Sequence, residues 1–264
     1  MSYRIFIAFF LLISCNEEEK KPSYISFEQK NDSIYVQLKN HVVSSSFLKV
    51  KDKINKKITY IDFIKPDTLT ILKFHQSKID TVTILKNYSF KLSYGASSFK
   101  KYDTLYNYNL PFPKGKRYRV LQGQNGSFTH KGPNSRYAID FKMNVGQEIC
   151  AIRAGMVVNV KSKFNEGGSS KKYLKKANLI LIFHSDGTFA QYGHLKKDGV
   201  LVKIGDTVKK GQIIGYSGNT GMSTEPHLHF AVYKPTKSGL VSIPYILDSI
   251  PTKKYKRGKY ANHN

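Results

Sequence analysis

Short segments in which apolar and polar residues alternate run through the first half of the chain and limit the folds open to it. Examples are residues 33–38, 58–63, 68–72, 80–85 and 88–92, which are rich in β-branched and aromatic side chains. A period of two residues predicts strands, because successive strand side chains point to opposite faces. Polar, proline and glycine residues between the segments predict turns. We therefore predict a small antiparallel β-sandwich over residues 23–106.

The second half consists of further β-like segments separated mainly by glycine, and it has no sustained helical period. Pro111, Pro113 and Gly115 predict a linker over residues 107–119. A second domain, an antiparallel β-sheet, is predicted over residues 120–250, followed by a basic tail over residues 251–264. The predicted fold class is all-β. Nothing catalytic is visible in the first domain, which we interpret as a spacer or binding module.

The amino terminus is typical of an export signal. An apolar run from Ile5 to Ile13 follows Arg4 and is too short to cross a bilayer, so residues 1–14 are predicted to be a signal peptide. The run ends in Leu12-Ile13-Ser14-Cys15, which resembles the lipobox of bacterial lipoproteins, in which the cysteine is lipidated. The alternative is an ordinary cleaved signal with a chance cysteine. The lipobox reading predicts a membrane anchor at Cys15.

Residues 15–22 would then be a lipidated linker. Their acidic run, Glu17 to Glu19, resembles the surface-export signal of Bacteroidetes lipoproteins; the alternative is a solvated linker. The expected location is the cell envelope, as an outer-membrane lipoprotein that faces the periplasm or is surface-exposed. With Cys15 acylated, Cys150 is the one thiol left and no internal disulfide can form. Between Ile149 and Ala151, Cys150 is expected to be a small buried hydrophobe and not a nucleophile.

The chain is strongly basic, with a formal net charge of +25 over 264 residues. Such a charge suits an anionic partner. Nucleic acid is one class of anionic polymer, but an export signal argues against it. The lysines are spread over both halves, so the alternative interpretation is a solvated basic surface.

His227-Leu228-His229-Phe230 has the strand period, so the two histidines share one face while Leu228 and Phe230 share the other. Leu228 and Phe230 would sit in the core. Two adjacent imidazoles repel when protonated, which favours a pair that is neutral and bound to a metal, usually zinc. The pattern alone is also compatible with two surface histidines beside a turn.

Two residues upstream have the chemistry to complete such a site. His130 lies in a loop of glycine, proline and asparagine, and Asp140 falls in the apolar segment Ala138-Ile139-Asp140-Phe141. An unpaired buried carboxylate is costly, so Asp140 needs a partner. A cation is one solution, and a capping or turn role is the other.

Several ordered motifs together carry a resemblance to a known family. They are His130 with Asp140, Tyr192-Gly193-His194-Leu195, the glycine-rich run from Gly205 to Gly215, Ser217-Gly218-Asn219-Thr220-Gly221-Met222-Ser223, and His227-Leu228-His229-Phe230. This series, over residues 120–232, resembles the lysostaphin-type (LytM-like) zinc metallopeptidases, which are peptidoglycan hydrolases. The resemblance implies one Zn2+ ion bound by His130, Asp140 and His229, with His194 and His227 as the catalytic pair. The gap between His130 and Asp140 is longer than the family's H-x-x-x-D spacing, which makes His130 the ligand most open to revision.

The resemblance implies a zinc-dependent endopeptidase that cuts peptide cross-links of cell-wall peptidoglycan, with the peptide stems and the membrane as partners. The sequence has no H-E-x-x-H motif to supply a glutamate base, so imidazoles would orient or deprotonate the attacking water. The alternative is a catalytically silent member of the same fold that binds peptidoglycan or activates an amidase. His184 matches no ligand position of the family and is left out of the site.

Overall fold

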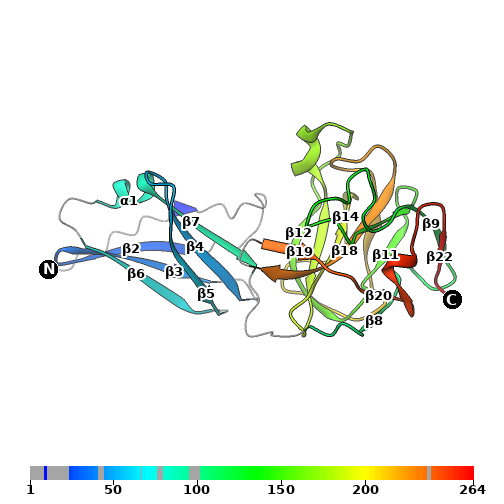
Figure 1. The fold of residues 1–264 in the computed structure, drawn as a ribbon, viewed down its shortest axis with the longest axis horizontal. Helices are drawn as coiled ribbons and strands as arrows, with labels where there is room; N and C mark the ends of the chain where they lie inside the picture. The colour runs from blue at the N-terminus through cyan, green and yellow to red at the C-terminus, as the bar shows by residue number, and fades with distance from the viewer. Residues whose placement is uncertain are drawn as a thin grey trace. The chain divides into compact units, whose positions relative to one another are not determined.

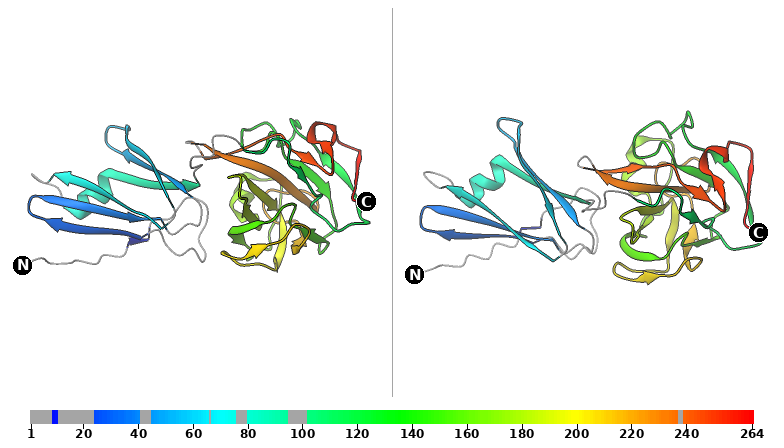
Figure 2. Two further views of the ribbon diagram at one scale, coloured as in Figure 1. Left: turned by 90° about the horizontal axis from the view of Figure 1, so that it is seen from below. Right: turned by 60° about the horizontal axis from the view of Figure 1, so that its bottom comes forward.

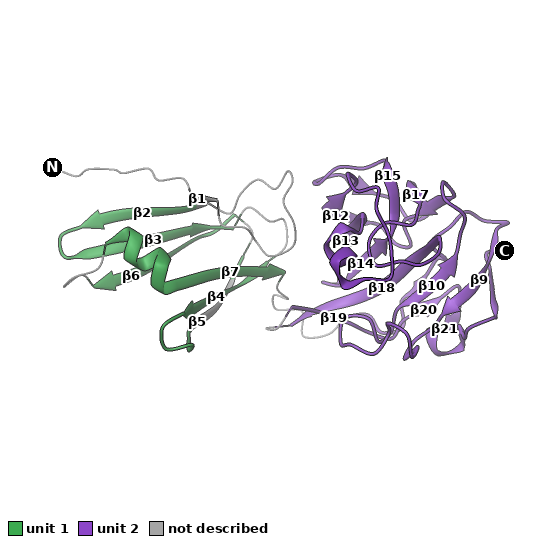
Figure 3. Cartoon of the chain, turned by 90° about the horizontal axis from the view of Figure 1, so that it is seen from above, with its two compact units in different colours: residues 1–98 green, residues 99–264 purple. Residues whose placement is uncertain are grey.

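The protein is nearly all β in a computed structural model, which describes residues 9–10, 24–40, 45–65, 67–75, 80–94, 102–236 and 239–264 (Figure 1). The prediction of an all-β fold is confirmed. The chain divides into two compact units, Met1–Ser98 and Phe99–Asn264, which Figure 3 shows in separate colours. The expected signal peptide, apart from the two-residue strand β1 (Phe9–Phe10), and the expected lipidation site Cys15 lie outside the described residues. No helix in the described part of the chain is long and apolar enough to cross a membrane.

The first unit is a sandwich of two small antiparallel sheets around one core (Figure 2). The first sheet has the order β1-β2-β3-β6 and the second the order β5-β4-β7. Alternation places Val36 of β3 and Leu48 of β4 in the same core, where both are fully buried. The strands that follow β1 are β2 (Tyr24–Lys30), β3 (Ser33–Lys39), β4 (Ser46–Asp52), β5 (Ile58–Ile64), β6 (Leu69–His75) and β7 (Tyr88–Tyr94).

The strand expected over residues 80–85 is wrong, because this segment forms the helix α1 (Thr81–Asn87). Asp80 caps its amino terminus by accepting a hydrogen bond from the backbone N–H of Thr83 at 2.6 Å. Such a cap typically stabilises a helix by about 1 kcal/mol, which here opposes the strand preference of the β-branched residues. The burial pattern agrees with a helix, since Ile84 is fully buried while Val82 is exposed.

The second unit contains a nine-stranded sheet in the order β16-β12-β13-β14-β18-β10-β9-β22, with β19 also paired to β18. Two three-stranded sheets, β11-β17-β15 and β21-β20-β8, complete it. Its strands are β8 (Asn107–Tyr108), β9 (Arg117–Gln122), β10 (Ile139–Lys142), β11 (Glu148–Cys150), β12 (Gly155–Lys161), β13 (Leu179–Phe183), β14 (Phe189–Gly193), β15 (Leu195–Val200), β16 (Thr207–Val208), β17 (Ile213–Ser217), β18 (His227–Thr236), β19 (Gly239–Ser242), β20 (Ile246–Leu247), β21 (Ile250–Pro251) and β22 (Tyr260–Asn262). Two 3-10 helices, Lys171–Lys176 and Thr252–Lys254, lie in its connections.

Residues 107–119, expected to form a linker, belong to the second unit. Tyr108, Leu110 and Phe112 are buried in its core, and strand β9 begins at Arg117 within the expected linker. Proline and glycine in this segment do predict turns. The apolar side chains between them are nevertheless buried, because removing apolar surface from water is favourable.

The carboxy-terminal residues 251–264 are likewise part of this unit and not a free basic tail. Strand β22 pairs with β9, and Tyr255 and Ala261 lie in the core. The backbone oxygen of Tyr255 approaches Gly123 so closely that a Cβ there would lie 2.0 Å from it. The last segment therefore packs against the start of the loop that carries His130.

The core of the second unit lies on one face of the large sheet. Leu228, Phe230 and Val232 of β18 are fully buried on that face, as the sequence predicts. His227 and His229 therefore project from the opposite face of the same strand, next to β10 and β14. The middle of this sheet positions the candidate site.

Candidate active site

A row of four residues across neighbouring strands forms the floor of the site. In the antiparallel register, Gln122 of β9 lies opposite Asp140 of β10, Asp140 opposite His229 of β18, and His229 opposite Gly193 of β14. Directly opposed residues on adjacent strands have their Cβ atoms about 4.5–5.5 Å apart and their side chains on one face. Strand pairing thus brings together residues that are up to 107 positions apart in the sequence (229 minus 122).

The loop between β9 and β10 adds His130, whose side chain is fully buried. Its Nδ1 lies 2.9 Å from the backbone oxygen of Gly123, so this nitrogen carries the proton and donates. The other nitrogen, Nε2, points at Asp140 and lies 3.2 Å from Oδ2. That approach lacks hydrogen-bond geometry, and Nε2 is a buried polar atom without a hydrogen-bond partner in the described structure. Its lone pair is therefore directed into the site.

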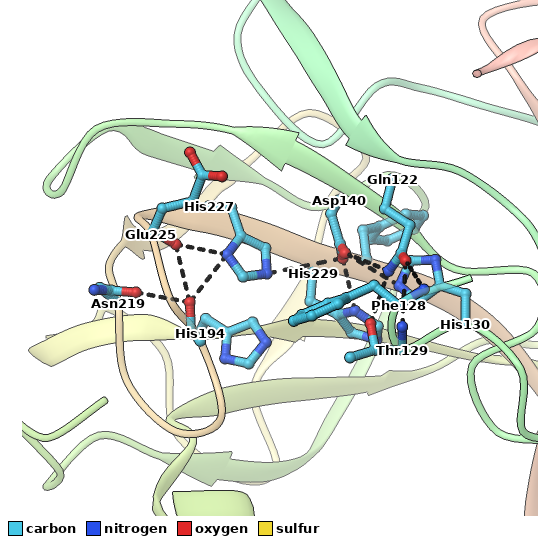
Figure 4. Close-up of polar contacts among 12 residues, drawn as sticks. Gln122, Phe128, Thr129, His130, Asp140, His194, Asn219, Glu225, His227 and His229 are labelled. Carbon is cyan, nitrogen blue, oxygen red and sulfur yellow. Dashed lines mark hydrogen bonds and ion pairs between the residues drawn. The ribbon is translucent and has the colours of Figure 1, made fainter. Parts of the chain in front are cut away.

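His130, Asp140 and His229 converge on one point, as Figure 4 shows. One ligand atom from each of the three lies within 4.8 Å of the other two. Nδ1 of His229 is 2.8 Å from Oδ1 of Asp140, and the rings of His130 and His229 have centroids 5.3 Å apart. The longer spacing between His130 and Asp140 is accommodated because the intervening loop folds back over β9 and β10.

The charges of this group favour an anionic carboxylate. Burial raises the pKa of Asp140, but the adjacent His130 and His229 outweigh it, and the pKa is lowered well below its usual range. Burial lowers the pKa of His130, while the adjacent Asp140 carboxylate raises it, with a net increase. The ionised carboxylate is thus held by imidazoles in a place where a divalent cation would interact with it more strongly.

The donor set fits a divalent metal ion. Two imidazole nitrogens and one ionised carboxylate match the three protein ligands of a catalytic site that keeps a further position open. Within the described residues, the buried Nε2 of His130 has no hydrogen-bond partner, and a metal ion would supply one. Its Nδ1 is already tied to a backbone carbonyl, the arrangement that orients ligating histidines in metalloproteins.

His194 and His227 form a pair beside His130, Asp140 and His229, which we call the metal-ligand group. The ring centroids of the pair are 4.5 Å apart (Figure 4). Nδ1 of His194 lies 2.6 Å from the oxygen of Thr220, and Nδ1 of His227 lies 2.8 Å from the oxygen of Glu225. Carbonyl oxygens only accept, so Nδ1 carries a proton in each ring, and Nε2 is the nitrogen left to face the site. Nε2 of His227 points toward the group and lies 3.9 Å from Oδ1 of Asp140.

The surroundings of His194 keep it neutral. Burial, together with the nearby His227 and His229, lowers the pKa of His194 to about 3. Its backbone has a φ of +63°, a left-handed conformation that is uncommon outside glycine. His194 directly follows Gly193, the residue opposite His229 in the sheet. The left-handed backbone of His194 directs its imidazole toward His227 and His229.

Several residues that hold this site were not singled out from the sequence. Gln122 hydrogen-bonds to Asp140, Thr220 orients His194, and Ser223 lies 3.0 Å from Nδ1 of His227. Thr220 and Ser223 belong to the Ser-Gly-x-Thr-Gly-x-Ser motif, so the motif was a signal for them. Gln122 had no local signal, because its role depends on the register of β9.

The other histidine and cysteine considered from the sequence lie apart from the site. His184 is buried, with Nδ1 at 2.9 Å from the oxygen of Ala154, and burial lowers its pKa to about 4. Cys150 is buried, and burial raises the pKa of its thiol to about 11. A thiol with a raised pKa is a poor nucleophile, which agrees with the sequence interpretation.

Known proteins resemble the second unit. The glycyl-glycine endopeptidase ALE-1 of Staphylococcus capitis is 40% identical over 139 residues, covering 52% of this chain and 31% of that protein. The peptidoglycan DD-endopeptidase ShyA of Vibrio cholerae is 34% identical over 117 residues, covering 43% of this chain and 24% of that protein. The matches therefore span about a third or less of the length of these curated relatives.

A solved structure of the catalytic domain of lysostaphin from Staphylococcus simulans is 33% identical to this chain; the match covers 55% of this chain and 90% of that domain, with a TM-score of 0.32. The family model of peptidase family M23 matches residues 134–240, which contain Asp140, His194, His227 and His229 but not His130. By this match, the segment of residues 134–240 belongs to peptidase family M23.

Proposed function

We propose that the protein is a zinc-dependent endopeptidase that cleaves peptide cross-links of bacterial cell-wall peptidoglycan. The observation that carries this proposal is the pairing of two groups on one sheet face. His130, Asp140 and His229 present a three-ligand donor set, and His194 and His227 present a pair of imidazoles beside it, each held through Nδ1 by a backbone carbonyl. A donor set of two histidines and one carboxylate is one that zinc accepts in hydrolases.

The chain's own residues would handle the protons and charges of hydrolysis. Zinc, when bound, would lower the pKa of a water molecule that it binds and would polarise the carbonyl group of the substrate. Nε2 of His227, directed at the site, would accept a proton from the attacking water and return it to the leaving amine. His194, anchored through Nδ1, would accept a hydrogen bond from the attacking water at its Nε2 and so orient that water. Ser223 and Glu225 keep the His227 ring in the required orientation.

Peptidoglycan is proposed as the substrate from the names of the relatives and from charge. One relative is a glycyl-glycine endopeptidase and another a peptidoglycan DD-endopeptidase. The net charge of +25 suits a polymer whose peptide stems carry carboxylates. Both relatives' names describe cleavage by an endopeptidase, which the same metal chemistry can perform.

A digest of purified peptidoglycan tests this function. Incubation with the protein is expected to convert cross-linked muropeptides into monomers, as measured by mass spectrometry. A chelator should abolish the conversion, and a stoichiometric addition of Zn2+ should restore it, because metal and active fold are linked. Bound zinc and bound peptidoglycan without new products would instead identify a catalytically silent member of the family.

Attachment to the cell envelope through a lipid on Cys15 is a further part of this proposal, supported by the sequence Leu12-Ile13-Ser14-Cys15. Since a single acyl chain binds membranes only reversibly, stable anchoring needs the several chains of a bacterial lipoprotein. Cys15→Ser is expected to move the protein from the membrane fraction to the soluble fraction. Cys150→Ala is the matched control and should stay with the membranes. Membrane retention of Cys15→Ser would contradict the anchor.

A further inference from the structure

The side-chain amide of Gln122 makes hydrogen bonds both to Asp140 and to the loop that carries His130. Its Oε1 accepts from the backbone N–H of Phe128 at 3.0 Å and of Thr129 at 3.2 Å. Its Nε2 donates to Oγ1 of Thr129 at 2.7 Å and to Oδ2 of Asp140 at 3.1 Å. An amide has two donor hydrogens and two acceptor lone pairs, and here all four are used. The orientation of the amide is therefore determined by its partners.

A β-bulge in β9 makes this contact possible. Gln122 pairs with Asp140 and Val120 pairs with Phe141, so consecutive residues of β10 face residues two apart in β9, and the register shifts between them. In a regular strand Val120 and Gln122 would point to the same face. The shift sends Val120 into the core, where it is fully buried, and Gln122 to the side of Asp140. Bulges re-aim side chains in this way beside functional sites.

The loop that Gln122 holds has other hydrogen bonds, such as those from Nδ1 of His130 to the oxygen of Gly123 at 2.9 Å and from the N–H of Asn125 to the oxygen of Arg136 at 2.7 Å, but these two do not contact Asp140. His130 lies ten residues (140 minus 130) before Asp140 in the sequence. A connection of this length does not by itself place the imidazole of His130 against the carboxylate of Asp140. Gln122 contacts the loop one and two residues before His130 and contacts Asp140 with the same amide. It thereby links two of the three members of the metal-ligand group.

We propose that Gln122 is a positioning residue that couples Asp140 to the His130 loop and so sets the geometry of the metal-ligand group. This rests on the proposed zinc site. One N–H on Oδ2 also restricts rotation of the Asp140 carboxylate and leaves Oδ1 facing His229. Loss of such outer contacts typically weakens metal binding by about 10- to 100-fold.

The test compares Gln122→Met with the wild-type chain. Methionine has a similar length and flexibility but makes none of the four strong hydrogen bonds. The zinc dissociation constant, measured by competition with a chromogenic chelator, should rise by about 10- to 100-fold. The visible spectrum of the cobalt(II)-loaded protein should change, because it reports the arrangement of the ligands. Gln212→Met is the matched control: its Oε1 also accepts a backbone N–H, from Lys209, on an exposed turn.

Gln122→Asn is the second variant, since its amide is one methylene too short to reach the loop and Asp140 together. It should also weaken zinc binding, and it decides the question if circular dichroism shows that Gln122→Met is unfolded. If Gln122 only stabilised the loop, both variants would lower the melting temperature of the metal-free protein and leave the zinc affinity and cobalt spectrum unchanged. That result would overturn the proposal while leaving the proposed function intact. Absence of zinc binding by the wild-type chain would overturn both.

Discussion

His229→Ala is expected to lose its zinc on dialysis and to lose cross-link cleavage with it. His229 supplies one of three ligand atoms that lie within 4.8 Å of one another, and a catalytic zinc site needs at least three protein ligands. The dissociation constant should rise by more than the roughly 10- to 100-fold expected for an outer contact. Asp140→Ala should behave in the same way, since removal of the carboxylate leaves His130 and His229 without the anion between them. Zinc content per protein, by atomic absorption, is the measurement.

His75→Ala is the matched control for these variants, because His75 is an exposed residue of strand β6 in the first unit. It should keep both zinc and cleavage. Stoichiometric zinc in dialysed His229→Ala would refute the assignment of the metal-ligand group. Zinc retained in His130→Ala alone would mean that another residue of the long loop supplies the first ligand. Of the three ligand variants, His130→Ala is the most informative, because His130 lies outside the segment that matches the family model.

The second large effect is expected from His227→Ala and His194→Ala, which should keep zinc and lose cleavage. Neither residue belongs to the group of three ligands. In each ring Nδ1 is bound to a backbone carbonyl, which leaves Nε2 available to the water or the substrate. Catalysis by a side chain that orients or deprotonates the attacking water is worth roughly 10²- to 10⁴-fold in rate. The cleavage rate should fall by such a factor with little change in zinc content. Both quantities are measured on the same preparation.

Each of these variants has an outcome that would reassign its residue. Cleavage at a near wild-type rate by either one would remove that histidine from the mechanism. Zinc loss from His227→Ala would make His227 a ligand, and the roles of the two histidines in His227-Leu228-His229 would then be exchanged. His184→Ala separates these effects from the general loss of a buried imidazole, because His184 contacts Ala154 and Tyr108 away from the site.

Local patterns in the sequence were enough to predict the fold class and the family. Alternation predicted most strands, and it placed Leu228 and Phe230 in the core with the two neighbouring histidines on the other face. These features depend on residues one or two positions apart, where the geometry of a strand leaves little choice. The segment 80–85 is an exception because the cap at Asp80, a single side chain, changes the outcome locally.

Residues 107–119 and 251–264 were misjudged for a different reason. Proline, glycine and lysine in these segments indicate turns and solvent, but Tyr108, Phe112 and Tyr255 find places in a core built by distant strands. Composition describes the average preference of a segment. The burial of single aromatic side chains within it depends on what surrounds them in the folded chain.

The candidate site shows the same division. The resemblance of the ordered motifs to the lysostaphin-type family implied His130, Asp140, His194, His227 and His229 as site residues. Only the tertiary structure brought His130 to Asp140 across a long loop, and only a shift of register in β9 turned Gln122 to their side. Register and bulges arise from pairing between strands that are far apart in the sequence, so no local period records them. The sequence by itself therefore determined which chemistry is available, and the pairing of β9, β10, β14 and β18 decided where its groups meet.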